Sequence, residues 1–127
     1  MRTLQNSKIA VTGGCGFIGS HLIQRLRRYA VRVLAIDNLA YGSRENLDLS
    51  DPDIQIENFD LRGGINGQLQ NLLKGVDYVF HLAAEKHNQS INAPVRVLDA
   101  NILGTYELLK AATEAGVKKV VFFLFWY

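Results

Sequence analysis

The sequence contains a single cysteine, Cys15, among 127 residues. One cysteine excludes an internal disulfide and any metal site built from several thiolates, so we expect no metal centre. The chain also lacks a large excess of positive or negative charge, because 14 basic and 12 acidic residues give a net charge of only +2. Without the basic stripe that follows a phosphate backbone, nucleic acid is not an expected partner.

Long apolar stretches are also missing from most of the chain. Residues 1–7 hold no apolar targeting segment, and no run reaches the roughly 20 apolar residues of a membrane span. We therefore expect a cytoplasmic protein without a membrane partner. With 48% hydrophobic and 20% charged residues, the composition suits one compact domain with its own core.

Strand-like apolar runs alternate with helical periods along the chain. The expected strands are 8–12, 31–36, 54–59, 77–82 and 119–125. Three helices are expected: the first has Ile18, Leu22, Ile23 and Leu26 on one face, the second includes Leu69, Leu72 and Leu73, and the third covers 97–115 and is closed by Gly116. This alternation predicts an α/β fold with a doubly wound parallel sheet in the order 3-2-1-4-5. The ligand crevice would then lie at the carboxyl ends of strands one and four.

A glycine-rich turn joins the first strand to the first helix at that crevice. Its spacing, Gly13-x-x-Gly16-x-x-Gly19, is typical of a Rossmann-like dinucleotide site. Gly13 would allow the tight turn, Gly16 the approach of backbone to phosphate, and Gly19 the close packing of helix on strand. The pyrophosphate would lie at the helix N-terminus. We expect Cys15 to serve the turn as a small residue, because no neighbour is placed to ionise its thiol.

Two aspartates end the second and third expected strands. Asp37 stands 18 residues after Gly19, close to the offset of about 20 expected for the acidic residue that binds the adenosine ribose. Its charge would repel a 2′-phosphate and so favours NAD over NADP. The alternative is a turn role, since Asp-Asn also suits a turn. For Asp60, an Asx turn is nearly as plausible as a ligand contact.

Five segments together resemble one enzyme family. These segments are TGGCGFIGSHL at 12–22, DNLAYGSRENL at 37–47, FDLR around Asp60, HLAAEKHNQSINAP at 81–94 and NILGTYELLKAA at 101–112. In order and spacing they resemble the NAD-dependent sugar-nucleotide epimerases and dehydratases, the extended short-chain dehydrogenase/reductases. The run DNL-x-x-GSREN is most similar to the UDP-sugar 4-epimerase branch.

The resemblance implies a set of NAD contacts. The residues are Phe17 and Ile18 at the pyrophosphate, Asp37 and Asn38 at the ribose, Asp60 and Leu61 at the adenine, Leu82, Ala83 and Ala84 on the path to the nicotinamide, Lys86 at the cofactor, and Asn101 as a brace. It also implies that a nucleotide-sugar substrate is bound only by a full-length relative.

The resemblance further implies which catalytic parts to expect after the fifth strand: a serine pair, a Tyr-x-x-x-Lys helix and a sugar-binding domain. None follows here, so we expect no catalytic residue in this chain. The literal match Tyr106 to Lys110 lies before the fifth strand, where residues four apart share a helix face for many reasons. An active short enzyme using Tyr106 and Lys110 is the less favoured alternative.

The last eight residues, 120–127, are an uncharged apolar run. On the exposed edge of a sheet, such a run favours pairing with another chain. We expect one incomplete NAD-binding domain over residues 1–127, truncated after the fifth strand, with 124–127 as a tail foreign to the family. A second reading is a stand-alone dinucleotide-binding or interaction module that self-associates through that strand.

Overall fold

The structure of the protein is a computed structural model that describes residues 4–85 and 89–123, with only the backbone described at 64–66. Its centre is a five-stranded sheet in the order β3-β2-β1-β4-β5, and every neighbouring pair is parallel. The strands are β1 (Lys8–Thr12), β2 (Arg32–Asp37), β3 (Ile54–Asn58), β4 (Tyr78–His81) and β5 (Lys119–Phe122). The predicted sheet and strand order are confirmed.

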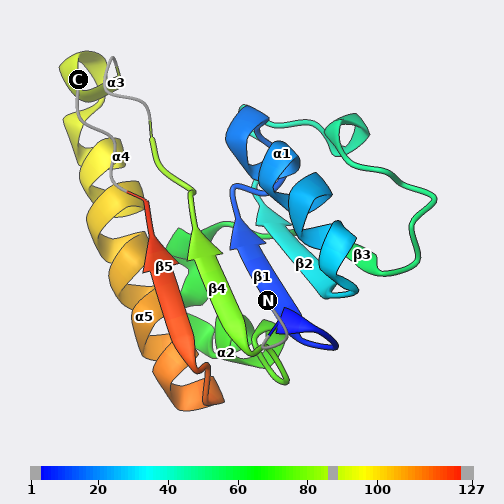
Figure 1. Ribbon diagram of the computed structural model, residues 1–127. Helices are drawn as coiled ribbons and strands as arrows, with labels where there is room; N and C mark the ends of the chain where they lie inside the picture. The colour runs from blue at the N-terminus through cyan, green and yellow to red at the C-terminus, as the bar shows by residue number, and fades with distance from the viewer. Residues whose placement is uncertain (1–3, 86–88, 124–127) are drawn as a thin grey trace.

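Helices cover both faces of this sheet (Figure 1). The two long helices are α1 (Phe17–Leu26) on one face and α5 (Gly104–Ala115) on the other, where the short helix α2 (Gln68–Leu72) also lies. A hydrophobic core lies on each face of the sheet. The strands contribute to both cores because successive side chains of a strand point to opposite faces. Ile9 and Val11 pack in the core that contains Ile23 of α1, whereas Ala10 packs in the core that contains Leu69 and Leu108.

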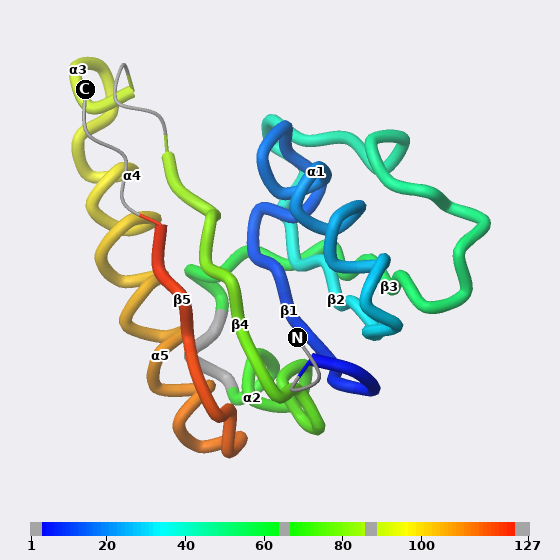
Figure 2. The backbone as a smooth tube through the Cα atoms, viewed as in Figure 1, coloured from blue at the N-terminus to red at the C-terminus, as the bar shows by residue number. Residues whose placement is uncertain are grey.

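Short helical segments complete the order of elements. They are η2 (Arg27–Tyr29), η3 (Arg44–Asn46), η4 (Leu61–Asn66), α3 (Gln89–Asn92), α4 (Pro94–Leu98) and the π-helical η5 (Asp99–Leu103). The stretch between β2 and β3 leaves the sheet and passes the start of α1 before it returns (Figure 2). None of the helices in the described part of the chain has both the length and the apolar character needed to cross a bilayer.

The expected helix over 97–115 ends at the predicted residue, Ala115, but its predicted start and its regularity are wrong. Helical backbone begins at Pro94, which suits a first helical position because proline has no N–H to leave unpaired. A π-helical turn then separates α4 from α5, and Gly116 ends the helix with φ of 78° as expected. The fifth strand ends at Phe122, and the residues after 123 lie outside the described part.

The ionisable side chain of His81 lies in the core at the end of β4. Its residue is 1% exposed, and burial lowers the pKa of the imidazole to about 4. The ring stacks on Phe122 with 5.3 Å between centroids, so β5 covers one side of it. The neutral imidazole is therefore the form that the fold holds.

We predict that this burial makes stability depend on pH. Between the ordinary pKa of 6.5 and the folded value of about 4, the unfolded chain binds a proton that the folded chain does not. The free energy of unfolding should therefore fall as pH drops from about 6.5 to about 4, by about 3 kcal/mol in total. Urea unfolding at a series of pH values measures this loss.

His81→Asn should flatten the slope in that pH range, and His21→Asn, at an exposed position, should leave it intact. An unchanged slope in the His81 variant would contradict the assignment. The carboxyl groups with lowered pKa, such as Asp60 at about 2, lose most of their contribution below about pH 4, and they are shared by the parent chain and both variants, so they do not affect the comparison.

Candidate functional site

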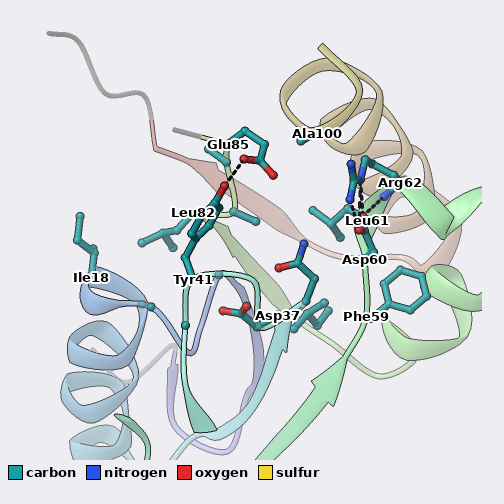
Figure 3. Close-up of a pocket in the computed structure, with 18 of the residues that line it drawn as sticks. Ile18, Asp37, Tyr41, Phe59, Asp60, Leu61, Arg62, Leu82, Glu85 and Ala100 are labelled. Atoms are coloured by element: carbon teal, nitrogen blue, oxygen red, sulfur yellow. Dashed lines mark hydrogen bonds and ion pairs between the residues drawn. The ribbon is translucent and has the colours of Figure 1, made fainter. Parts of the chain in front are cut away.

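A pocket of about 370 Å³ lies at the carboxyl ends of the strands, where the strand order reverses at β1 and β4 (Figure 3). It is lined from the glycine turn, the ends of β2 and β3, the segment after β4, and Ala100. Twelve of the fourteen candidate residues line it: Gly13, Gly16, Phe17, Ile18, Gly19, Asp37, Asn38, Asp60, Leu61, Leu82, Ala83 and Ala84. Their contact with a cofactor stays a prediction.

The glycine turn is shaped by two close backbone approaches. Gly13 has φ of +68°, and a Cβ there would lie 3.0 Å from the nitrogen of Ala83. A Cβ on Gly19 would lie 2.1 Å from the carbonyl oxygen of Gly13, a separation that no side chain tolerates. The turn therefore needs glycine at both positions, for the conformation at Gly13 and for helix packing at Gly19.

The N-terminus of α1 faces this pocket and has no capping side chain. Gly16 is the N-cap and offers no side chain, and the first turn contains no acidic residue. The first N–H groups of a helix have no acceptor within the helix, and the helix dipole adds a partial positive charge there. This end of α1 is thus suited to a phosphate group.

The Cys15 thiol is not a reactive group in this turn. The residue is fully buried, and burial, followed by the nearby Asp37 charge, raises the pKa of the thiol to about 11. The thiol therefore stays protonated at neutral pH and acts as a small core side chain.

Asp37 connects β2 to the glycine turn. One carboxylate oxygen accepts the Cys15 N–H at 3.0 Å, and the other accepts the Leu39 N–H at 2.8 Å. The turn role is thus present in the structure. A carboxylate oxygen has a second lone pair, so this arrangement leaves acceptors for a ribose hydroxyl. The ribose contact itself stays a prediction.

Asp60 also makes a local turn. Its Oδ1 accepts the Arg62 N–H at 3.0 Å, and its Oδ2 lies 2.6 Å from Nη2 of Arg62. The hydrogen bond from the Arg62 side chain is the main cause that lowers the pKa of Asp60 to about 2. Arg62 lines the pocket too, although sequence reasoning did not single it out beyond the FDLR segment.

Sequence reasoning missed a bridge across the pocket. The Tyr41 hydroxyl, from the loop after β2, donates to Oε2 of Glu85, after β4, at 2.8 Å (Figure 3). Nε of Arg96 donates to the other oxygen of Glu85 at 3.0 Å, and the Glu85 side chain is 4% exposed. The hydrogen bond to Glu85 raises the pKa of Tyr41. No sequence pattern pairs positions 44 residues apart, so this bridge could be identified only from the three-dimensional structure.

Gly42, next to Tyr41, was also missed. A Cβ there would lie 2.7 Å from both the carbonyl carbon and the oxygen of Cys15. The same oxygen accepts the Ser43 N–H at 3.1 Å and Nδ2 of Asn46 at 2.8 Å. The loop after β2 is therefore fixed directly on the glycine turn.

The remaining two candidates lie elsewhere. Lys86 is outside the described residues. Asn101 stands behind the pocket wall, where its Oδ1 accepts the Glu85 N–H at 2.8 Å. Tyr106 on α5 is 58% exposed and is not among the described residues that line the pocket. Within the described ranges, no three His, Cys, Asp or Glu side chains are grouped to hold a metal ion.

Comparison with known proteins identifies the fold's relatives. The model of the NAD dependent epimerase/dehydratase family matches residues 9–124. The chain belongs to this family. All five segments quoted above fall within the matched range, as the resemblance implied.

Individual relatives agree. The chain is 35% identical over 118 residues to a UDP-glucose 4-epimerase of Halalkalibacterium halodurans, covering 90% of this chain and 33% of that protein. It is 41% identical over 115 residues to dTDP-glucose 4,6-dehydratase 1 of Escherichia coli, covering 83% and 30%. Among solved structures, the Bordetella bronchiseptica enzyme WbmF in complex with NAD⁺ matches with a TM-score of 0.85 and 32% identity, covering 94% and 36%.

The chain thus spans only part of the length of the curated relatives it matches, from 24% to 37%. The matched part of WbmF belongs to a protein whose structure was solved with NAD⁺ bound.

We predict that Gly42→Ala weakens the fold at the site. The new Cβ would meet the Cys15 backbone, which has no side-chain freedom to move away. Overpacking of this kind typically lowers the free energy of unfolding by about 1–3 kcal/mol. Gly63→Ala is the matched control, because a Cβ there meets nothing within 4 Å. Urea unfolding of both variants checks this, and equal stability of the two would contradict the packing argument.

Proposed function

We propose that this chain binds NAD in the pocket and forms the N-terminal cofactor-binding part of a nucleotide-sugar epimerase or dehydratase. The observation that carries the proposal is the glycine turn leading into an α1 N-terminus that faces the pocket and has no capping side chain. This geometry suits the pyrophosphate of a dinucleotide. NAD, when bound, supplies a hydride acceptor.

The two ends of the pocket suit the two halves of a dinucleotide. Asp37 and Asp60 line the end formed by β2 and β3, where hydroxyl groups of an adenosine would find acceptors. Leu82, Ala83 and Ala84 line the wall after β4, and their short apolar side chains suit a nicotinamide ring. The Asp37 carboxylate would repel the 2′-phosphate of NADP.

We further propose that the chain alone holds the cofactor without turning over a sugar. The described residues that line the pocket include no serine, lysine or histidine. The Tyr41 hydroxyl donates to Glu85, and its raised pKa makes the phenolate less accessible as a base. The nucleotide-sugar substrate and its binding domain are proposed for the full-length relatives only.

Calorimetric titration with NAD tests the cofactor proposal. We expect saturable binding, with NADP weaker by about tenfold or more because of the Asp37 charge. Gly16→Ala should weaken NAD by at least about tenfold, since its methyl group would occupy the path of the pyrophosphate. The Gly16 backbone, with φ of −80° and ψ of −178°, accepts alanine, and the new Cβ would meet only the carbonyl oxygen of Gly13, at 3.3 Å, so the fold should persist after a small adjustment.

Gly63→Ala again serves as the control and should bind NAD like the parent chain. Absence of binding by the parent chain would overturn the cofactor proposal. Measurable epimerase turnover that is lost in Tyr106→Phe would overturn the proposal of inactivity and support the alternative enzyme.

A second candidate function is self-association through β5. In the described part of the chain, this strand ends the sheet and pairs with β4 alone. Phe122, the last residue of β5, is 52% exposed, and Phe123, which follows the strand, is 37% exposed. An exposed apolar edge supports strand addition by a second copy.

We predict that Phe122→Lys reduces self-association measured by sedimentation velocity over a dilution series. A lysine on an edge strand opposes pairing with another strand through its charge. Leu49→Lys is the control, because Leu49 is 62% exposed but lies in the loop between β2 and β3. A parent chain that stays monomeric at every concentration would rule the candidate out.

A further inference from the structure

A hydrogen-bonded chain of side chains runs behind the pocket wall. Nδ1 of His81 lies 2.6 Å from Oγ1 of Thr12, the last residue of β1. Nε2 of His81 lies 2.9 Å from Oγ1 of Thr105 on α5. The Thr105 hydroxyl donates to the carbonyl oxygen of Asn101 at 2.7 Å. These contacts join β1, β4 and the helical region 99–115.

The direction of each hydrogen bond follows from counting donors. Oγ1 of Thr12 accepts two backbone N–H groups, from Leu82 and Ala83, both at 3.1 Å. A hydroxyl oxygen has two acceptor positions, so the Thr12 hydroxyl proton is left to donate to Nδ1 of His81. The neutral imidazole then carries its proton on Nε2 and donates it to Thr105.

This chain of bonds holds both ends of the wall 82–85. Thr12 fixes the N–H groups of Leu82 and Ala83 at one end. Asn101 fixes the other end, where its Oδ1 accepts the Glu85 N–H at 2.8 Å and its Nδ2 donates to the Glu85 carbonyl at 3.4 Å. His81 and Thr105 connect Thr12, at one end of the wall, to Asn101, at the other, through hydrogen bonds.

The wall faces the glycine turn at contact distance. A Cβ on Gly13 would lie 3.0 Å from the nitrogen of Ala83 and 3.2 Å from the carbonyl carbon of Leu82. A shift of the wall by a fraction of an ångström would therefore change the width of the pocket beside the turn. The π-helical turn Asp99–Leu103 places Asn101 within reach of Glu85, as irregular turns of this kind often do at functional sites.

We infer that Thr105 and His81 are positioning residues, which act through Thr12 and Asn101 to hold the wall 82–85 at the separation from the glycine turn that a dinucleotide requires. The ligand part of this inference rests on the proposed function, whereas the positioning of the wall is a property of the chain without ligand. Neither residue lines the pocket.

Thr105→Val tests the inference, because valine keeps the shape of threonine and removes the hydroxyl. Amide hydrogen exchange in the chain without ligand should accelerate at Leu82, Ala83 and Glu85 by on the order of tenfold, and exchange at Val33 in β2 should change less. NAD affinity should weaken in the same variant, and Thr105→Ser, which keeps the hydroxyl, should restore both.

Thr113→Val provides the matched control on the same helix. The Thr113 hydroxyl donates to the Leu109 carbonyl at 2.9 Å, four residues earlier, as Thr105 does to Asn101. Its loss should leave exchange at 82–85 and NAD affinity unchanged. Equal acceleration at Val33 and at the wall in Thr105→Val would overturn the positioning role, because it would indicate loss of overall stability alone.

The tautomer of His81 gives a second test that needs no variant. Nitrogen NMR of the parent chain at pH 7 should show neutral His81 with the proton on Nε2. A proton on Nδ1 would overturn the inferred bond directions. If the parent chain does not bind NAD, the proposed function fails, and the exchange and tautomer results still decide whether Thr105 and His81 position the wall.

Discussion

The site depends first on the contact between the start of α1 and the turn that precedes it. A Cβ at Gly19 would lie 2.1 Å from the Gly13 carbonyl oxygen, so only glycine lets the helix axis meet the end of β1 this closely. That approach directs the first N–H groups of α1 at the crevice beyond β1 and β4. A side chain at position 19 would move the helix away from the end of β1, and its first N–H groups and its dipole would then lie farther from the crevice. The parallel sheet forms the crevice, and this contact places the N–H groups at the start of α1 beside it.

The carboxylates near the pocket already accept hydrogen bonds from other groups of the protein. Asp37 holds the N–H groups of Cys15 and Leu39, Asp60 holds Arg62, and Glu85 receives Tyr41 and Arg96. Among the described residues, no buried side-chain nitrogen or oxygen lacks a hydrogen-bond partner. The walls are thus fixed by bonds within the protein, and a ligand would use lone pairs that remain. This explains how Asp37 can satisfy the turn interpretation and still suit a ribose.

Much of this fold followed from local sequence patterns. The alternation of apolar runs predicted the five strands and their order, and Gly13, Gly16 and Gly19 predicted the turn because its requirements are local and steric. The bridge from Tyr41 to Glu85, the contact of Gly42 with Cys15 and the link through His81 were not predictable, since each joins residues distant in sequence. The π-helical turn was not predicted either. Such a turn adds one residue to a helix, and the apolar periodicity over 97–115 does not reveal that addition. Gly42 lies within the segment 37–47 that resembles the family, but its contact with the Cys15 backbone is visible only in the structure.

The two loops that flank the glycine turn are held by different means. The loop after β2 is fixed by backbone contact, through Gly42 and the Cys15 carbonyl, whereas its tip at Tyr41 reaches Glu85 through one hydroxyl. The wall after β4 is held at both ends by Thr12 and Asn101. The bridge between Tyr41 and Glu85 thus joins two sides of the pocket that other contacts already hold, and the geometry of the glycine turn and of the wall 82–85 is set by those contacts within each side.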